Sequence, residues 1–190
     1  MDLWVLDHTL RFLAAHREKL PGQRFAINLA PSTVCRVQFP LEVSRLLTHY
    51  AIEPWQLIFE VTECSTFCNA EQALHILRQL QKMGVRIAID DFGTGYASYA
   101  RLKSVDADIL KIDGSFIRNI VNNSLDYQIV ASICHLARMK KMLVVAEYVE
   151  TEEIRSAVHA LGIDYVQGYL IGKPVALESL AETEASTADA

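Results

Sequence analysis

Two acidic residues stand side by side near the middle of the chain, where an apolar run gives way to glycines. Asp90 and Asp91 follow the run RIAI at 86–89 and precede FGTG. Neighbouring carboxylates repel each other, so they need protons or cations close by. Such a pair can bridge two divalent metal ions, an arrangement used to hydrolyse phosphate esters. A turn that combines an aspartate with glycines is the alternative, and the motif alone does not separate the two.

Other apolar runs also carry a polar side chain at or near their C-terminal end. These side chains are Asn28, Glu60, Lys111, Asp113, Glu147 and Gln167. Glu60 and Lys111 interrupt apolar segments, where a charge costs stability unless it has a partner. In a parallel α/β protein such strand ends meet at one face, where active sites are built. Carboxylate and amide oxygens suit Mg²⁺ or Mn²⁺ better than Zn²⁺, so the pattern predicts a magnesium or manganese site.

Helical and strand-like segments alternate along the chain. The apolar spacing predicts helices over 1–16, 41–50, 69–84, 124–141 and 151–162. Short apolar runs predict strands over 24–30, 56–63, 85–90, 108–113, 142–147 and 164–170, with a loop and short helix before the fourth. Asn69 is the expected N-cap of the third helix and Gly84 its stop. This alternation favours an α/β sheet or barrel of parallel strands.

Composition narrows the class of protein. The chain has 190 residues, 51% of them hydrophobic and 22% charged, which is enough for one soluble domain. A net charge of −5 argues against binding to DNA, because no basic stripe faces a phosphate backbone. The four cysteines lack CxxC spacing, so we expect reduced thiols rather than a zinc ribbon. Neither a membrane-spanning run nor a signal peptide is evident, and we expect a cytoplasmic protein.

Six segments, in order, resemble the successive motifs of the EAL-domain cyclic-di-GMP phosphodiesterases of bacteria. They are FAINLA, LIFEVTE, AIDDFGTGYAS, ILKID, VVAEYVE and DYVQGYLIGKP, and the likeness extends from Leu3 to Pro174. The resemblance implies a modified TIM-like (βα)8 barrel, with an EAL-like domain at 1–178 and a polar tail at 179–190. It also implies a two-metal site for Mg²⁺ or Mn²⁺, and hydrolysis of cyclic di-GMP to linear pGpG.

The resemblance also implies roles for individual residues. Five positions match the family's metal ligands, with Asp91 as the bridging one: Asn28, Glu60, Asp90, Asp91 and Glu147. Lys111 matches the lysine that orients the attacking water, and Gln167 matches a glutamine near that water. Glu63 matches the glutamate that steadies the loop after DDFG. Asp113 and Glu150 match further polar residues of the site.

The sequence departs from the family pattern in two places. The first barrel strand, which carries the Glu-Ala-Leu motif and one more metal ligand, is absent, so we expect an incomplete barrel. We therefore expect slower turnover than in a version with that strand, and two alternatives stay open: a non-hydrolysing cyclic-di-GMP receptor and a protein-interaction module. The second departure is Tyr148, which stands where the family usually has glycine.

Family likeness also indicates partners. These are cyclic di-GMP itself, a second copy in a homodimer, and sensory or GGDEF domains N-terminal to this segment in a longer parent protein.

Overall fold

The computed structural model describes residues 1–62, 70–93 and 105–180. The strands are β1 Phe25–Asn28, β2 Leu57–Thr62, β3 Arg86–Phe92, β4 Ile109–Ile112, β5 Leu143–Ala146 and β6 Tyr165–Val166. The α-helices are α1 Asp2–Ala15, α2 Pro31–Val34, α3 Phe39–Tyr50, α4 Ala70–Lys82, α6 Gly114–Ile117, α7 Ser124–Met139 and α8 Glu152–Ala160. Two 3₁₀ turns, η1 Pro54–Gln56 and η3 Leu177–Ser179, complete the described elements.

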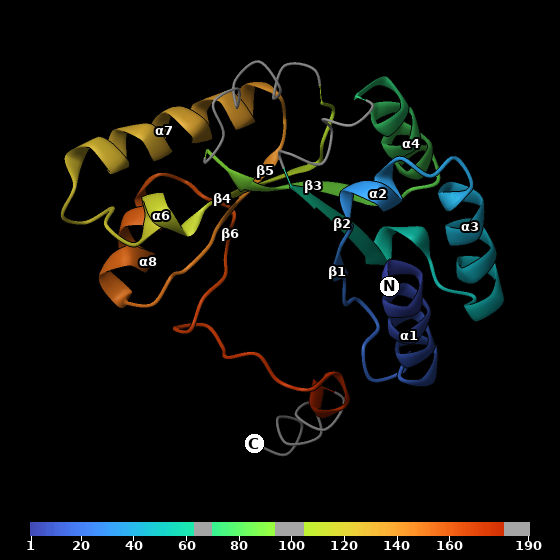
Figure 1. The fold of residues 1–190 in the computed structure, drawn as a ribbon. Coiled ribbons are helices and arrows are strands. Elements are labelled where there is room, and N and C mark those ends of the chain that lie inside the picture. Colours follow the sequence, from blue (N-terminus) through green and yellow to red (C-terminus); the bar gives the residue numbers. More distant parts are fainter. Residues whose placement is uncertain (63–69, 94–104, 181–190) are drawn as a thin grey trace. The chain divides into compact units, whose positions relative to one another are not determined.

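The strands follow one another in the order β1-β2-β3-β4-β5-β6, which is also their order in the chain. β1 pairs with β2 in parallel, and the parallel pairings of β3 with β4, β4 with β5 and β5 with β6 form a second continuous series. Helices fall between the strands (Figure 1). The fold class is therefore α/β, with the strand order of an incomplete (βα)8 barrel.

The chain divides into two compact units. The first unit comprises Met1–Glu60, Thr66–Arg86 and Pro174–Ala190, and the second comprises Val61–Ser65 and Ile87–Lys173. Each unit holds part of the predicted polar set at its strand ends, so the two are described separately.

In the first unit, α1 packs against β1 and α3 (Figure 1). Its buried side chains include Leu6, Leu10 and Leu13, which recur at helical spacing as predicted. The predicted helix over 69–84 is present as α4, and its apolar residues Ala73, Leu77 and Leu80 are buried. Gly84 follows it with φ 98°, a conformation that suits glycine and ends the helix.

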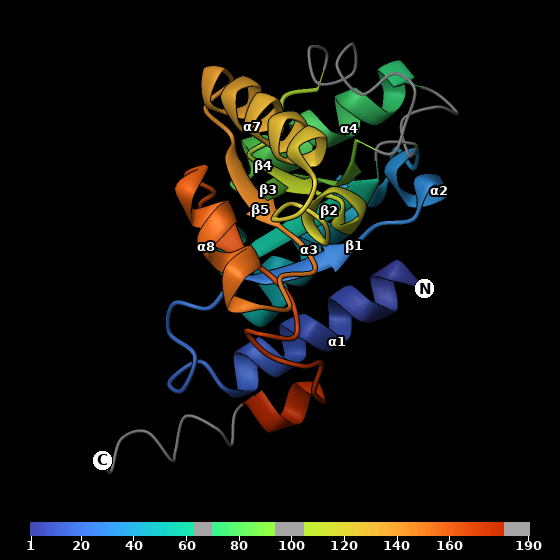
Figure 2. The ribbon, with the colours of Figure 1, turned by 90° about the vertical axis from the view of Figure 1, so that its left-hand side faces the viewer.

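In the second unit, α7 packs against β5 and α6 (Figure 2). The side chain of Asn123 accepts hydrogen bonds from the backbone N–H groups of Leu125 and Asp126, which caps the N-terminus of α7. Thr151 caps α8 in the same way, through the N–H of Ile154. Cys134 is buried in α7 as a free thiol, and burial raises its pKa. These caps fix where the helices begin and hence where the strand ends between them lie.

The structure corrects several element boundaries. β6 has two residues, far fewer than the expected 164–170, and β3 continues through the acidic pair to Phe92 instead of ending at Asp90. The short helices α2 and α6 were not predicted, because four residues are too few to show an apolar period. Asn69, Cys64, Cys68, the tail from 181 and most of the loop and helix expected before β4 lie outside the described residues. Among the residues described, no helix is both long and apolar enough to cross a membrane.

Candidate metal centre

A β-bulge brings the carboxylates of the acidic pair together. The register of β3 against β4 shifts between Ile89 and Phe92, and Asp91 has a left-handed backbone with φ 54°. In a regular strand two successive side chains point to opposite faces. The bulge breaks that alternation, and carboxylate oxygens of Asp90, Asp91 and Glu147 all lie within 4.8 Å of one another. We call these three residues the acidic cluster.

Lys111 ties the cluster together from the neighbouring strand. Its Nζ lies 2.9 Å from Asp90 Oδ1 and 2.8 Å from Glu147 Oε1. The Lys111 side chain is only 6% exposed, and the two carboxylate side chains are 12% and 11% exposed. A buried ammonium group of this kind needs opposite charge in contact with it. The two ion pairs supply that charge and link β3, β4 and β5.

Strand register explains why these side chains meet. Lys111 pairs with Val145 across the β4–β5 ladder. Glu147 lies two residues beyond Val145, and side chains two apart point to the same face of a sheet. The lysine and the glutamate therefore lie on one face, at adjacent C-terminal strand ends, where active sites of parallel α/β proteins are found.

Burial and mutual repulsion raise the pKa values of two carboxylates of the cluster. The pKa of Glu147 lies above its ordinary value because the group is buried, and Asp90 and Asp91 add to the increase while Lys111 opposes it. The pKa of Asp91 is also raised, first by burial and then by the charges of Asp90 and Asp113. Without a further cation, the ionised cluster is thus unfavourable in the folded state.

The donor set suits a divalent cation. Three carboxylates face one ammonium group, so the ionised cluster carries an excess of two negative charges. The lysine contacts one oxygen of Asp90 and one of Glu147, which leaves each group a second oxygen for another ligand role. Oxygen-only donors in this number favour Mg²⁺ or Mn²⁺ over zinc. The cluster alone balances the charge of one divalent ion.

Three other predicted site residues lie in the second unit without joining the cluster. Asp113 accepts a hydrogen bond from the N–H of Ser115 and so caps α6, although its charge still raises the pKa of Asp91. Gln167 is exposed, and its backbone bonds to Ala146 and Val149 hold the chain after β6 against the end of β5. Glu150 is exposed as well.

The remaining predicted residues belong to other parts of the chain. Asn28 is the last residue of β1 and Glu60 lies in β2, two residues before its end; both belong to the first unit and pair directly in register. Asn28 is exposed, whereas Glu60 is buried at 9% exposure. The first unit therefore places one amide and one carboxylate side by side at its own strand ends. Glu63 lies outside the described residues.

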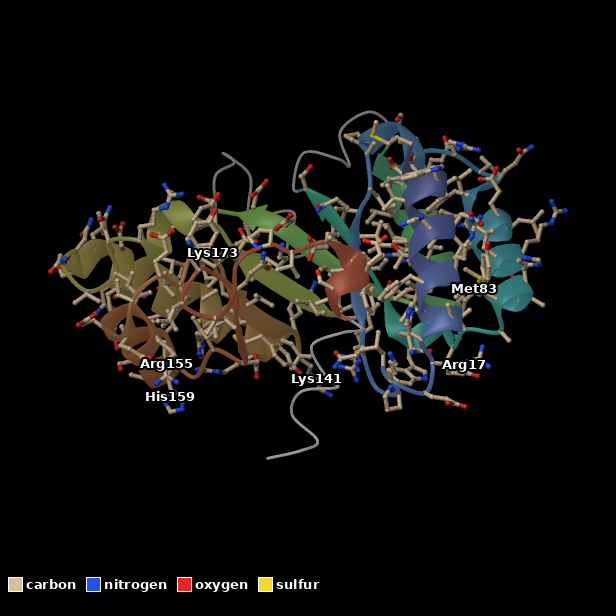
Figure 3. The ribbon with its side chains drawn as sticks, turned by 90° about the horizontal axis from the view of Figure 1, so that it is seen from below. Arg17, Met83, Lys141, Arg155, His159 and Lys173 are labelled. Carbon is tan, nitrogen blue, oxygen red and sulfur yellow. The ribbon has the colours of Figure 1, made fainter. Side chains whose placement is uncertain are left out.

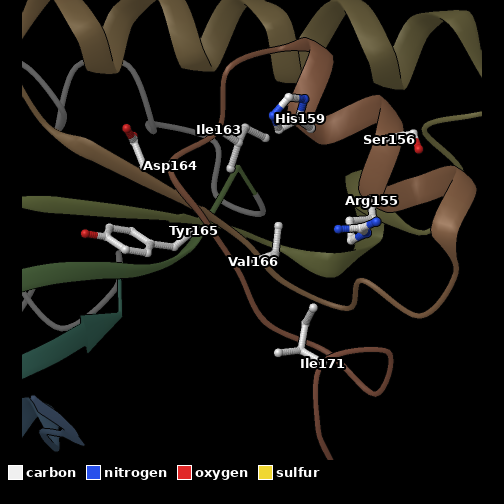
Figure 4. Close-up of a pocket in the computed structure, with 8 residues that line it drawn as sticks. All are labelled: Arg155, Ser156, His159, Ile163, Asp164, Tyr165, Val166 and Ile171. Carbon is white, nitrogen blue, oxygen red and sulfur yellow. The ribbon is translucent and has the colours of Figure 1, made fainter. Parts of the chain in front are cut away.

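A pocket of about 450 Å³ lies elsewhere in the second unit, between α8 and β6 (Figure 4). Arg155 and His159 reach it from α8, and Asp164 and Tyr165 from the start of β6. Figure 3 shows Arg155 and His159 close together on the surface. None of the residues that line this pocket belongs to the predicted site, and its polar groups form no metal-ligating cluster of the kind described above.

Sequence reasoning did not identify one further arrangement next to the cluster. The guanidinium of Arg118 lies over the ring of Tyr148, 4.0 Å from its centre. Tyr148 itself was noted as a departure from the family pattern, but no motif or spacing marks Arg118. Only the path of the chain after β4 brings the two together.

Comparison with known proteins identifies the family. The model of the EAL domain matches residues 1–174. The cyclic di-GMP phosphodiesterase PdeF of Escherichia coli K12 is 70% identical over 185 residues, which are 97% of this chain and 25% of that protein. PdeB of Shewanella oneidensis, also named a cyclic di-GMP phosphodiesterase, is 44% identical over 96% of this chain and 21% of its own length. The chain thus spans about a quarter of the length of these curated relatives.

Solved structures agree. A structure described as the PaMucR phosphodiesterase in complex with c-di-GMP superposes with a TM-score of 0.84 at 39% identity, over 94% of this chain and 72% of that one. The EAL domain of Mycobacterium smegmatis DcpA gives a TM-score of 0.92 at 30% identity, over 98% of this chain and 84% of that one. With a family match over nearly the whole described sequence and the same fold in solved members, the chain belongs to the EAL domain family.

Proposed function

We propose that this chain acts in a divalent-metal-dependent phosphodiesterase that hydrolyses cyclic di-GMP to linear pGpG. The observation that carries the proposal is the cluster of Asp90, Asp91 and Glu147 beside Lys111, in which Asp90, Glu147 and Lys111 are buried. It occurs in a chain 70% identical to a protein named a cyclic di-GMP phosphodiesterase. Charge, donor type and position at the strand ends all suit metal-assisted phosphate chemistry.

Mg²⁺ or Mn²⁺, when bound, would supply Lewis-acid stabilisation and a water of lowered pKa. Asp90, Asp91 and Glu147 are the proposed ligands in the second unit. Because their excess charge matches one divalent ion, a second ion needs more donors. Asn28 and Glu60, adjacent in register at their own strand ends, are proposed as those further ligands from their match to the family motifs.

Lys111 is proposed to act on the attacking water and on the phosphoryl oxygens. Its two ion pairs hold the ammonium group in one place, so little reorganisation is needed as negative charge develops on the phosphoryl oxygens. The water oxygen bonds to phosphorus as the bond from phosphorus to the ribose 3′-oxygen breaks, and that oxygen leaves with a proton. Removal of Lys111 would therefore lower the rate of this step as well as stability.

The other matched residues have supporting roles in this proposal. Gln167 lies after β6, and we propose that its amide helps to hold the attacking water. Glu63 is proposed to steady the loop after DDFG, and Asp113 and Glu150 to complete the polar surroundings. Asp113 already influences Asp91 through its charge.

The longer relatives suggest the protein context. MucR of Pseudomonas aeruginosa, named a bifunctional diguanylate cyclase and cyclic di-GMP phosphodiesterase, is 40% identical, and this chain matches 26% of its length. From the family resemblance we propose that the chain works in the cytoplasm beside sensory or GGDEF domains, and as a homodimer.

The direct test is formation of pGpG from cyclic di-GMP, followed by chromatography in Mg²⁺, in Mn²⁺ and in excess chelator. Asp91→Asn removes one charge from the cluster, and asparagine tolerates the left-handed backbone found there. We expect turnover to fall at least about a hundredfold, as for loss of one preorganised charged group at a reaction centre. Asp106→Asn, at a side chain 69% exposed, is the matched control and should keep full turnover.

Unchanged turnover in Asp91→Asn would disprove the metal mechanism. Binding of cyclic di-GMP by the wild-type chain with no pGpG in either metal would assign a receptor instead. No binding at all would point to a protein-interaction module.

A further inference from the structure

Tyr148 has a backbone conformation that bulky residues rarely adopt. It directly follows Glu147 of the acidic cluster and has φ 54°. Four non-glycine residues of the described chain have positive φ, and two of them, Ala51 and Lys141, lie just past the ends of α3 and α7. Helices often end in this conformation. Asp91 and Tyr148 have no such explanation, and both stand at strand ends, in or beside the acidic cluster.

The structure makes room for the Tyr148 ring at Gly114. A Cβ atom on Gly114 would lie 2.0 Å from Cδ2 and 2.6 Å from Cγ of Tyr148. Any other residue at 114 would therefore displace the ring. Gly114 has no positive φ, so this close approach, not backbone freedom, is what requires glycine there.

Arg118 also contacts the ring from the α6 turn. Its guanidinium carbon lies 4.0 Å from the ring centre, a distance typical of a cation–π contact. Gly114 and Arg118 are four residues apart across the single turn of α6, so they lie on one face of that turn. The ring is thus supported from α6, and Tyr148 remains 44% exposed.

The supported ring lies at the edge that carries the cluster. Asp113 and Gly114 directly follow β4, and Glu147 and Tyr148 directly follow β5. The ion pair of Lys111 with Glu147 joins these same two strands. A partly exposed aromatic ring with a cation over one face therefore borders the carboxylates of the acidic cluster, all within the second unit.

We propose that Tyr148 is a substrate-binding residue whose exposed ring face stacks on a purine base while the adjacent phosphate is held at the acidic cluster. The proposal rests on the proposed function for the phosphate half of the site. A nucleotide has the matching parts, a planar base and an anionic phosphate, and bases stack on aromatic side chains. In this proposal the guanidinium of Arg118 lies over the other face of the ring and holds it in its orientation.

Three substitutions at position 148 separate stacking from backbone effects. Tyr148→Phe keeps the aromatic face. Tyr148→Leu keeps apolar bulk and the unfavourable positive φ but removes the face. Tyr148→Gly removes the face and relieves the backbone. The measurements are KM and kcat for cyclic di-GMP, calorimetric binding of cyclic di-GMP and of pGpG in Mg²⁺, and a thermal melt of each variant.

Stacking predicts that Phe behaves as the wild type, whereas Leu and Gly both raise KM and the dissociation constant of pGpG about tenfold, with kcat little changed. A KM unchanged in both Leu and Gly overturns the proposal. So does a normal Leu variant with kcat altered in Gly alone, because the residue would then act through the backbone of Glu147. If the wild type binds cyclic di-GMP without cleaving it, the proposed function fails while the calorimetric series still decides on stacking. A wild type that neither binds nor cleaves it overturns both.

Discussion

The acidic cluster and the pocket between α8 and β6 are opposite kinds of site within one compact unit. The pocket offers about 450 Å³ of space, but its ionic pair of Arg155 with Glu152 joins side chains that are 55% and 62% exposed. The cluster packs three carboxylates and a lysine that is 6% exposed around a β-bulge. Charge and backbone strain are concentrated at the cluster, which is the proposed metal site, whereas the pocket offers space and exposed polar groups.

Substitution of Lys111 by methionine should change the free energy of unfolding more than any of the other substitutions proposed. It removes the cation between Asp90 and Glu147 and leaves buried carboxylates without compensation, so the free energy of unfolding should fall by about 3–5 kcal/mol. Urea unfolding with excess chelator measures this. Lys173→Met, the same change at an exposed lysine, should stay within about 0.5 kcal/mol of the wild type. Similar losses in both variants would show that the cluster is no special electrostatic site.

Addition of metal tests whether the cluster, and not the pocket, is the ligand site. At a free Mg²⁺ or Mn²⁺ concentration one hundred times the dissociation constant, stability should rise by about 2.7 kcal/mol. Thermal melts with and without metal measure the gain. Glu147→Gln should lose most of it, while His159→Gln in the pocket should retain it. A gain lost only in the pocket variant would reverse the assignment.

The folding stability of the metal-free protein should depend on pH in the direction that a raised carboxyl pKa requires. A carboxyl group with a higher pKa in the folded state stabilises folding at low pH, and that contribution is lost as pH rises. For Glu147 the loss begins near its ordinary pKa of 4.5 and is complete above the raised folded value. The stability of the wild type relative to Glu147→Gln should therefore fall through this range, measured by chemical denaturation at a series of pH values.

Glu153 provides a control of opposite sign. Hydrogen bonds from its own backbone N–H and from Thr151 lower its pKa from 4.5. The stability of the wild type relative to Glu153→Gln should rise with pH over the range just below that value. If the stability of the wild type relative to each variant changed with pH in the same direction for Glu147 and Glu153, the electrostatic account of the cluster would be contradicted.

The smallest effect is expected in the pocket itself. Arg155→Ala breaks an exposed ion pair with Glu152, and such pairs contribute about 0–1 kcal/mol. Turnover of cyclic di-GMP should be unchanged, in an assay run beside the Asp91→Asn variant. A loss of turnover comparable to that of Asp91→Asn would place the pocket in the reaction and remove the contrast between the two regions.

Most of the fold could be predicted from local pattern. The stripes of buried residues in α1 and α4 and the stop at Gly84 depend on neighbours within a few turns, so the longer helices were located correctly. The length of β6 was overestimated. The apolar, aromatic run at 164–170 has the composition of a strand, but only Tyr165 and Val166 pair with β5. The short α6 was missed, although it supports Tyr148.

The sequence by itself determined which residue types stand at or near the strand ends, and with them the family and the metal chemistry that we propose. The tertiary structure decided which of these side chains contact one another. The bulge at Asp90 and Asp91 is a register shift of β3 against β4. The ion pairs of Lys111 with Asp90 and Glu147, and the contacts of Tyr148 with Gly114 and Arg118, join residues from different strands or loops. Contacts of this kind depend on strand register and on the path of the chain between strands. Neither can be predicted from the residue pattern within one segment.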